Sequence, residues 1–376
     1  MRACEVSVIG GGPAGAAAAC HLARMGRAVT LIEQSASPRH KVCGEFLSHE
    51  AIRYLAELEV DLDRLGARPI HGVRLAARRR LAAADLPFPA FSLTRRRLDE
   101  ALLDRAVACG AQVHRGRRVE ALEHADGAWS ARLADGSTIE SRAAFLATGK
   151  HDLRGHPRPA SMQGNCVAFK MYWQLSPSQQ DLLQGWVEVF LFPGGYAGLL
   201  LTEDSAANLC LLVRREVLSR CQNDWSSLLA WILRHSEPLA ERLDGATPFL
   251  PRPLAIYSIP YGLLRSESED GLWLLGDQTA VIPSFAGDGI SIALHSARVA
   301  GNLYCEGETP GLLAHRLHRQ LRGPMRCAGA VAAAMMAAPA AAAFTRMWPR
   351  SLRYIAQLTR LPPAAMARRG LTPADW

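Results

Sequence analysis

The chain has 376 residues, more than one compact core usually holds, which favours two domains. Hydrophobic residues make up 49% of it and charged residues 21%, a composition that argues against a disordered chain. The formal net charge is +8, but neither a basic helix interleaved with aromatic residues nor a zinc-finger spacing accompanies it, so we expect no nucleic-acid partner.

The nine cysteines are scattered, and no pair has the CxxC spacing of a metal or redox site. The chain begins directly with a predicted strand rather than with a signal peptide. We therefore expect free thiols, no metal centre and a cytoplasmic location.

The first predicted elements form a strand, a glycine turn and a helix. The strand is Val6–Ile9 and the helix is Ala16–Met25. Between them, Gly10 makes the tight turn, Gly12 lets a pyrophosphate approach the backbone, and Gly15 lets the helix pack against the strand. The free N–H groups at the start of the helix favour an anionic ligand, so this segment predicts a dinucleotide site.

A second strand, Ala28–Ile32, ends in Glu33, where a carboxylate is able to accept hydrogen bonds from a ribose. The remaining elements of the first half indicate a parallel sheet with inserted segments. They are a helix at His49–Leu58, a strand at Ile70–Leu75, an amphipathic helix at Ser92–Cys109, a strand at Gly110–Val113, a hairpin at Val119–Arg142 with its turn at Ala134–Gly136, and a strand at Ala143–Ala147.

The pattern changes near Cys166 to short strands separated by turns, for which antiparallel pairing is expected. These strands contain many aromatic residues, which suit either a sheet core or the wall of a pocket for a flat or greasy substrate. The strands are Val167–Trp173, Val187–Phe192, Tyr196–Leu201 and Asn208–Val213, followed by a helix at Ser226–Arg234. The aromatic residues are Phe169, Tyr172, Trp173, Phe190, Phe192, Tyr196, Tyr257 and Tyr261.

A second glycine motif follows the predicted strand Gly271–Leu275 and precedes an alanine-rich helix at Ser291–Leu303. It starts with Gly276-Asp277 and runs to Ile290. Asp277 can hold a sugar-like hydroxyl, while the later glycines let the backbone lie against a flat ligand. The start of the helix would stabilise the negative charge of a reduced flavin.

The last third of the chain is predicted to be helical. Ala328–Phe344 carries no charge, but it is short, rich in alanine and interrupted by Pro339, so a membrane span is not expected. A packed helical hairpin or peripheral membrane contact fits it better. Residues that suit such a contact follow at once, namely Trp348, Arg350, Arg353 and Tyr354.

Together with Arg95, Leu98 and Asp99 in an R-x-x-L-D arrangement, these motifs resemble the FAD-dependent oxidoreductases of the p-hydroxybenzoate hydroxylase and geranylgeranyl reductase superfamily. The resemblance covers roughly residues 4–305. It implies an α/β fold, with a Rossmann-like FAD-binding domain, an inserted antiparallel-sheet substrate domain and a helical C-terminus. The implied boundaries are 1–165 and 266–305 for the FAD-binding domain, 166–265 for the substrate domain and 306–376 for the helical region.

The resemblance also implies the site residues. Cys43, Glu45 and Tyr196 are candidates for catalysis, and the Lys41–Gly44 run is similar to the Lys-x-Cys-Gly of geranylgeranyl reductases. The residues implied to bind FAD are Gly10, Gly12, Pro13, Ala14, Gly15, Glu33, Gln34, Lys41, Cys43, Gly44, Arg95, Gly276, Asp277, Pro283, Gly287, Asp288, Gly289 and Ile290.

Departures from the family pattern bear on the reaction. The Asp-Gly pair of aromatic hydroxylases is replaced by Ala147–Arg154, which puts direct use of NAD(P)H in doubt, and the W-x-W-x-I-P motif of halogenases is absent. The favoured hypothesis is a monooxygenase that acts on a hydrophobic aromatic or polyketide-like molecule through a flavin C4a-hydroperoxide. The alternatives are a reductase or dehydrogenase of C=C or C–N bonds, and a flavin-binding subunit at a membrane or partner. Electrons would come from NAD(P)H or a separate flavin reductase, and a carrier protein is a further candidate partner.

Overall fold

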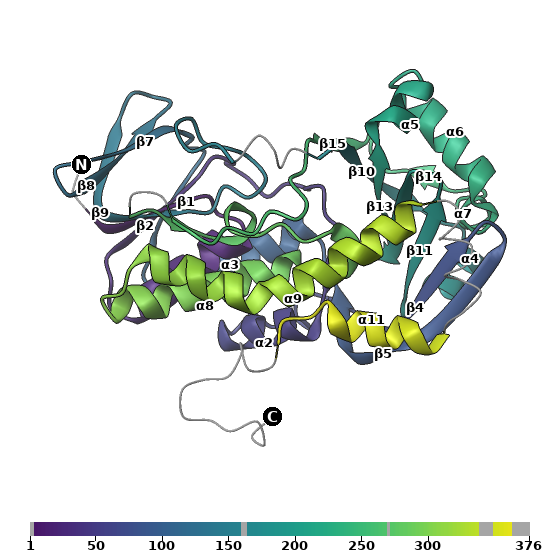
Figure 1. Ribbon diagram of the computed structural model, residues 1–376, viewed down its shortest axis with the longest axis horizontal. Helices are drawn as coiled ribbons and strands as arrows, with labels where there is room; N and C mark the ends of the chain where they lie inside the picture. The colour runs from purple at the N-terminus through teal and green to yellow at the C-terminus, as the bar shows by residue number, and fades with distance from the viewer. Residues whose placement is uncertain (1–3, 159–163, 269–270, 338–348, 363–376) are drawn as a thin grey trace.

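The computed structural model describes residues 4–158, 164–268, 271–337 and 349–362. Two sheets stand side by side, and long helices run beneath them (Figure 1). The first sheet has the order β6-β2-β1-β9-β8-β7, with β16 also paired to β9. Its strands are β1 (Cys4–Ile9), β2 (Val29–Glu33), β6 (Gln112–Arg115), β7 (Val119–Ala125), β8 (Ala128–Leu133), β9 (Thr138–Leu146) and β16 (Trp273–Leu274).

The first sheet is parallel except at β7 and β8, which extend it as an antiparallel meander. The predicted parallel sheet with insertions is thus confirmed. The turn at Ala134–Gly136 joins β8 to β9, and the predicted strand Ala143–Ala147 is the end of β9 rather than a separate strand. The predicted strand Gly271–Leu275 is reduced to Trp273–Leu274.

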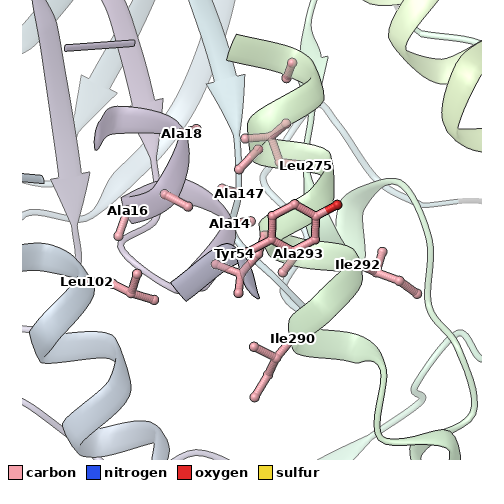
Figure 2. Close-up of a cluster of buried hydrophobic side chains, with 14 of the residues drawn as sticks. Ala14, Ala16, Ala18, Tyr54, Leu102, Ala147, Leu275, Ile290, Ile292 and Ala293 are labelled. Carbon is pink, nitrogen blue, oxygen red and sulfur yellow. The ribbon is translucent and has the colours of Figure 1, made fainter. Parts of the chain in front are cut away.

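Helices α1 (Pro13–Arg24), α2 (His49–Glu57), α3 (Arg95–Ala108) and α8 (Gly289–Cys305) pack with the first sheet into one core (Figure 2). Ala16–Ala19 of α1 are fully buried, and their small side chains let the helix lie close to both the sheet and α8. This close packing fixes the start of α1 next to the loop after β1.

The second sheet has the order β14-β10-β13-β12-β11-β4-β5-β3, with β15 also paired to β10. Neighbouring strands are antiparallel except for the parallel pair of β4 and β11. The strands are β3 (Phe46–Leu47), β4 (Arg68–Ala77), β5 (Arg80–Ser92), β10 (Cys166–Gln174), β11 (Trp186–Phe192), β12 (Gly195–Leu201), β13 (Ala207–Arg214), β14 (Thr247–Pro248) and β15 (Leu254–Tyr257).

The long hairpin of β4 and β5 was missed by sequence, which predicted only Ile70–Leu75. Pro87 and Pro89 lie within β5 and cannot donate to a ladder, so the segment does not resemble a strand. This N-terminal hairpin completes a sheet whose other half comes from beyond Cys166, so the two parts of the chain are interleaved.

The aromatic residues of the second sheet divide between its two faces. Phe169, Trp173, Phe190 and Phe192 pack in a core with helix α6 (Trp225–His235). Of the two alternatives, a sheet core and a pocket wall, these four residues follow the first, because strand alternation turns them to the helix-covered face. Tyr196 lies on the opposite face with a different cluster.

The C-terminal region is helical, as predicted. Helix α9 (Pro310–Met336) contacts strands of both sheets, and α11 (Pro349–Leu358) lies along β5 (Figure 1). The first part of the predicted alanine-rich hairpin is the end of α9, while residues 338–348, and with them Trp348, lie outside the described residues. Among the helices described, none is both long and apolar enough to span a bilayer.

A buried ion-pair network ties the interleaved parts together. Glu188 of β11 is 1% exposed and lies 2.8 Å from Nη1 of Arg74 in β4 and 2.8 Å from Nε of Arg242 in α7 (Glu237–Arg242). Because Glu188→Gln leaves two partly buried guanidinium groups without their counter-charge, we expect it to lower the free energy of unfolding by roughly 3 kcal/mol, measured by urea denaturation.

The control is Glu120→Gln, whose ion pairs with Arg118 and Arg132 are partly exposed. We expect this variant to unfold at the wild-type urea concentration. Equal stability of the Glu188→Gln and Glu120→Gln variants would contradict the importance of the network.

Candidate functional site

A cavity of about 670 Å³ is lined by both sheets and by the C-terminal helices. One end is formed by loops that follow parallel strands of the first sheet, which is where ligands bind in open α/β folds. The other end is formed by apolar side chains of the second sheet and α9. The cavity therefore joins a polar region to an apolar one.

Most of the predicted cofactor residues line this cavity. Gly15, Pro283 and Asp288 are not among its lining residues. Cys43, Glu45 and Tyr196, the predicted catalytic residues, also line it. The cofactor residues in the wall are Gly10, Gly12, Pro13, Ala14, Glu33, Gln34, Lys41, Cys43, Gly44, Arg95, Gly276, Asp277, Gly287, Gly289 and Ile290.

The glycine loop between β1 and α1 is shaped by close backbone contacts. Gly10 has a φ of +104°, and a Cβ on Gly15 would lie 1.8 Å from the carbonyl oxygen of Gly10. Both positions therefore require glycine. A Cβ on Gly12 would meet only Nη2 of Arg95, at 3.5 Å, so Gly12 leaves room on the ligand side.

Glu33 is held at the end of β2 by two backbone donors. The N–H of Gly11 donates to Oε2 at 2.7 Å, and the N–H of Ser35 donates to Oε1 at 2.8 Å. A carboxylate has about four acceptor positions, so two remain for ribose hydroxyls. The two backbone donors thus fix the orientation of the Glu33 carboxylate.

Arg95 and Lys41 share one carboxylate. Arg95 donates to Asp99 from Nε at 2.7 Å and from Nη2 at 3.0 Å, and Lys41 Nζ donates to the same carboxylate at 2.8 Å. Although burial opposes ionisation, these two cations lower the pKa of Asp99 below its ordinary value. Two positive charges are therefore held at the cavity wall beside Gly12.

The loop Ala147–Arg154, which lacks the Asp-Gly pair, carries a lysine that sequence reasoning overlooked. Nζ of Lys150 lies 3.2 Å from Asp277, and this neighbouring charge raises the pKa of Lys150. The side-chain amide of Gln278 donates to the carbonyl oxygens of Gly149 and His151 at 2.8 and 3.0 Å. The second glycine motif thus positions the loop after β9.

Asp288 points toward the C-terminal segment. Its Oδ1 accepts a hydrogen bond from Nη1 of Arg360 at 2.7 Å, and Nη2 of Arg360 donates to the carbonyl oxygen of Ala286 at 2.9 Å. Burial raises the pKa of Asp288 to about 7, against the effect of the Arg360 cation. The contact is not evident from the sequence because it joins residues that only the tertiary fold brings together.

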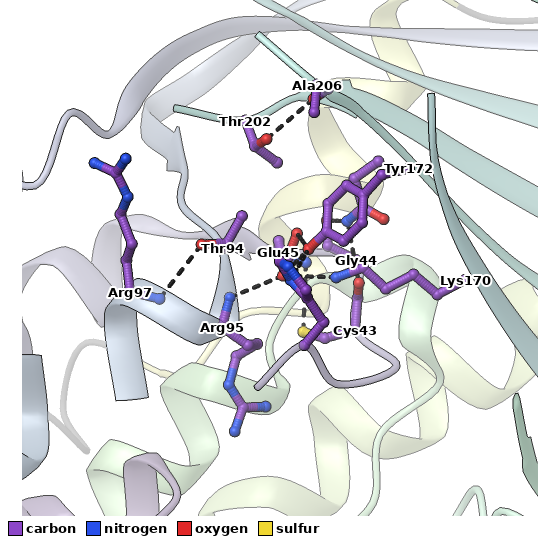
Figure 3. A network of polar contacts seen from close by, with 12 residues as sticks. Cys43, Gly44, Glu45, Thr94, Arg95, Arg97, Lys170, Tyr172, Thr202 and Ala206 are labelled. Carbon is purple, nitrogen blue, oxygen red and sulfur yellow. Dashed lines mark hydrogen bonds and ion pairs between the residues drawn. The ribbon is translucent and has the colours of Figure 1, made fainter. Parts of the chain in front are cut away.

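The segment Cys43–Glu45 is anchored to the second sheet (Figure 3). The carboxylate of Glu45 is fully buried, lies 2.6 Å from Nζ of Lys170, and accepts from the hydroxyl of Tyr172 at 2.7 and 2.8 Å. The amide of Asn208 donates to the carbonyl oxygens of Cys43 and Gly44, both at 3.1 Å. The sequence signal that could have indicated this contact is Lys170, a charged residue within the otherwise apolar strand β10.

Tyr196 supplies a polar group in the apolar part of the cavity. Its hydroxyl lies 2.7 Å from Oγ of Ser284, and it accepts from the N–H of Phe285 at 3.3 Å. Burial raises the pKa of both Tyr196 and the neighbouring Tyr261. The two phenols therefore stay protonated and are suited to hydrogen bonding rather than to acid–base exchange near neutral pH.

Comparison with known proteins shows which families have sequences similar to this chain. The family model described as "FAD binding domain" matches residues 3–159. The menaquinone reductase of Mycobacterium tuberculosis is 27% identical over 84% of this chain and 81% of its own. The digeranylgeranylglycerophospholipid reductase 2 of Methanopyrus kandleri is 27% identical over 80% of this chain and 77% of its own. This chain is an FAD-dependent oxidoreductase that is similar to these reductases.

The same fold occurs in solved structures. The myxobacterial chondrochloren halogenase superposes with a TM-score of 0.76 at 19% identity, covering 97% of this chain and 92% of that one. At this identity the similarity concerns the fold. It agrees with the predicted fold class, an FAD-binding domain with an added sheet and a helical C-terminus.

The residues present fit FAD. The glycine cradle leaves space where a pyrophosphate would approach, Glu33 has acceptors for a ribose, and Arg95 and Lys41 provide positive charge. The later glycines Gly287 and Gly289 line the same cavity without side chains. FAD is therefore the cofactor of this enzyme.

The open side of Gly12 gives a direct test of the cradle. Gly12 has a φ of −75°, so a larger residue fits the backbone but occupies the ligand side. We expect Gly12→Val to weaken FAD binding at least about 100-fold, or about 2.8 kcal/mol, in a fluorescence titration. The matched control is Gly323→Ala in α9, where a Cβ meets open space and FAD affinity should not change. Unaltered affinity in the Gly12→Val variant would exclude this loop as the pyrophosphate site.

Proposed function

We propose that this flavoprotein reduces a carbon–carbon double bond in a long apolar substrate of the prenyl type. The observation that carries the proposal is the apolar end of the cavity, which continues from the FAD loops along the second sheet to α9. Its wall is made of aliphatic side chains, and burying a hydrocarbon chain there yields roughly 25 cal/mol per Å². The wall includes Val73, Leu75, Val187, Val189, Leu200, Leu211, Val331 and Met335.

The names of the relatives support the same proposal. One is a menaquinone reductase and another a digeranylgeranylglycerophospholipid reductase, and each alignment covers more than three quarters of both chains. A geranylgeranyl group is a long unsaturated hydrocarbon chain. An apolar cavity next to a flavin site suits such a substrate.

In this proposal Cys43 acts as the proton donor. Bound FAD supplies hydride transfer to one carbon of the double bond. The other carbon needs a proton, and the partly buried thiol of Cys43 lines the cavity beside that site. The backbone N–H of Glu45 donates to the Cys43 sulfur at 3.4 Å and so helps to orient it in the loop.

A monooxygenase acting on an aromatic or polyketide-like molecule is the second candidate. The Tyr196 hydroxyl beside Ser284 favours it, because it offers a hydrogen bond to a ring hydroxyl within an otherwise apolar wall. NAD(P)H or a separate flavin reductase would supply electrons in either case. Peripheral membrane contact would help to deliver a prenyl substrate, and the exposed Arg353 and Tyr354 on α11 suit such a contact.

Single-turnover chemistry separates the two candidates. The enzyme is reduced with dithionite under anaerobic conditions, freed of excess reductant, and mixed with a geranylgeranyl ether lipid or a prenylated quinone. We expect the flavin to reoxidise without oxygen and the product to gain two hydrogen atoms by mass spectrometry. Reoxidation only with oxygen and a phenolic substrate, with gain of one oxygen atom, would overturn the reductase proposal in favour of the monooxygenase.

Substitution of the thiol tests its proposed role. We expect Cys43→Ala to lower kcat by about 10²- to 10⁴-fold at unchanged KM, because a positioned proton donor is lost. Cys327→Ala serves as control, since Cys327 is a partly exposed cysteine of α9 outside the cavity wall. A Cys43→Ala enzyme with wild-type kcat would show that the proton comes from another group.

A further inference from the structure

A buried ion pair connects the FAD-facing loop with the second sheet (Figure 3). Glu45 and Lys170 are both completely buried, and Glu45 has a φ of +59°, a backbone conformation that non-glycine residues rarely adopt. Taking two charges out of water costs several kcal/mol per ion, and an apolar pair of similar size would often be as stable. The pair therefore calls for an explanation beyond stability.

A directed chain of hydrogen bonds leads from this pair toward solvent. Tyr172 has one hydroxyl proton, and its contacts of 2.7 and 2.8 Å to the two oxygens of Glu45 show that it is donated there. Nδ1 of His40 lies 3.1 Å from the Tyr172 oxygen, so His40 must carry its proton on Nδ1 and donate it. His40 is half-buried, whereas Glu45 is inaccessible. A proton can therefore reach Glu45 through two side chains.

We propose that reduction of the bound FAD is coupled to protonation of Glu45, with the proton arriving through His40 and Tyr172. A reductant such as NAD(P)H or a flavin reductase would supply two electrons, which the isoalloxazine would take up with one proton and one unit of negative charge, and the carboxylate of Glu45 would bind a second proton. No other bond of the protein changes. Once Glu45 is neutral, the ammonium group of Lys170 is left to balance the charge of the reduced flavin.

The local electrostatics support this coupling. Burial raises the pKa of Glu45 above its ordinary value, while Lys170 and the hydrogen-bond donors oppose the rise. A new negative charge nearby raises it further. Burial, Lys170 and Arg96 lower the pKa of His40 to about 4, so His40 is neutral near pH 7 and can pass a proton. The charged and titratable groups around Glu45 and Tyr172 are Lys170, Arg95, Cys43, Cys210, His40 and Glu203.

The proton count of the purified holoenzyme tests the proposal directly. The midpoint potential of the flavin is measured against pH between about pH 6 and 9 by equilibration with redox dyes. We expect the wild-type slope to correspond to two protons per two electrons over part of this range, and that of Glu45→Gln to one. A wild-type slope of one proton throughout would overturn the proposal, whether or not the variant folds.

Cys43→Ala is the matched control, because Cys43 is a titratable neighbour in the same loop. We expect it to retain the second proton, and loss of that proton in this variant would reassign the uptake to the thiol. The readout does not depend on substrate, so failure of the reductase proposal leaves this test intact.

The route of the proton is tested by kinetics. With a pH-indicator dye in stopped flow, we expect Tyr172→Phe and His40→Gln to slow proton uptake on flavin reduction at least tenfold while keeping the count of two. His49→Gln is the control, since His49 lies at the start of α2 outside the hydrogen-bond chain. Wild-type uptake rates in both Tyr172→Phe and His40→Gln would exclude this route.

Discussion

The contact of three loops without intervening side chains is the constraint on which the FAD site depends. Gly10 approaches Ala147 so closely that a Cβ on Gly10 would lie 2.5 Å from the carbonyl oxygen of Ala147. A Cβ on Gly276 would lie 3.1 Å from the Cβ of Ala14. These loops follow β1, β9 and β16, which are neighbours in one parallel sheet. Parallel pairing therefore brings distant segments together, and glycine lets them touch closely enough to form one cradle.

The cradle alone does not determine the reaction, because the apolar end of the cavity is built from the second sheet. Strand alternation in β10 sends Phe169 into the helix-covered core and Lys170 and Tyr172 toward the Cys43 loop. The same strand thus stabilises the second sheet on one face and holds the FAD-facing segment on the other. Strand β10 also contributes Ala168 to the cavity wall, so it contacts both the Cys43–Glu45 segment and the cavity.

The features of the site that the sequence predicts depend on short motifs, whereas those that it does not predict depend on contacts between segments far apart in the chain. The first glycine motif is in part a local signal, because a Cβ on Gly15 would meet the carbonyl oxygen of Gly10 only five residues earlier. The parallel pairing of β4 with β11 and the contact of Arg360 with Asp288 join segments far apart in sequence, and no periodicity encodes them. Lys170 is intermediate between these two cases. A charged residue in an apolar strand indicates a buried partner of opposite charge, but it does not identify which residue that partner is.

Several cations in or near the cavity wall are paired with carboxylates of the chain. This pairing limits the cost of burying these cations. FAD carries two phosphates and, when reduced, a further negative charge. A cation of one of these pairs can interact with those charges instead of its carboxylate if the carboxylate binds another partner or a proton. Glu45 alone among these carboxylates has a hydrogen-bonded tyrosine and histidine beside it in the described structure. The pairs are Asp99 with Arg95 and Lys41, Asp277 with Lys150, Asp288 with Arg360, and Glu45 with Lys170.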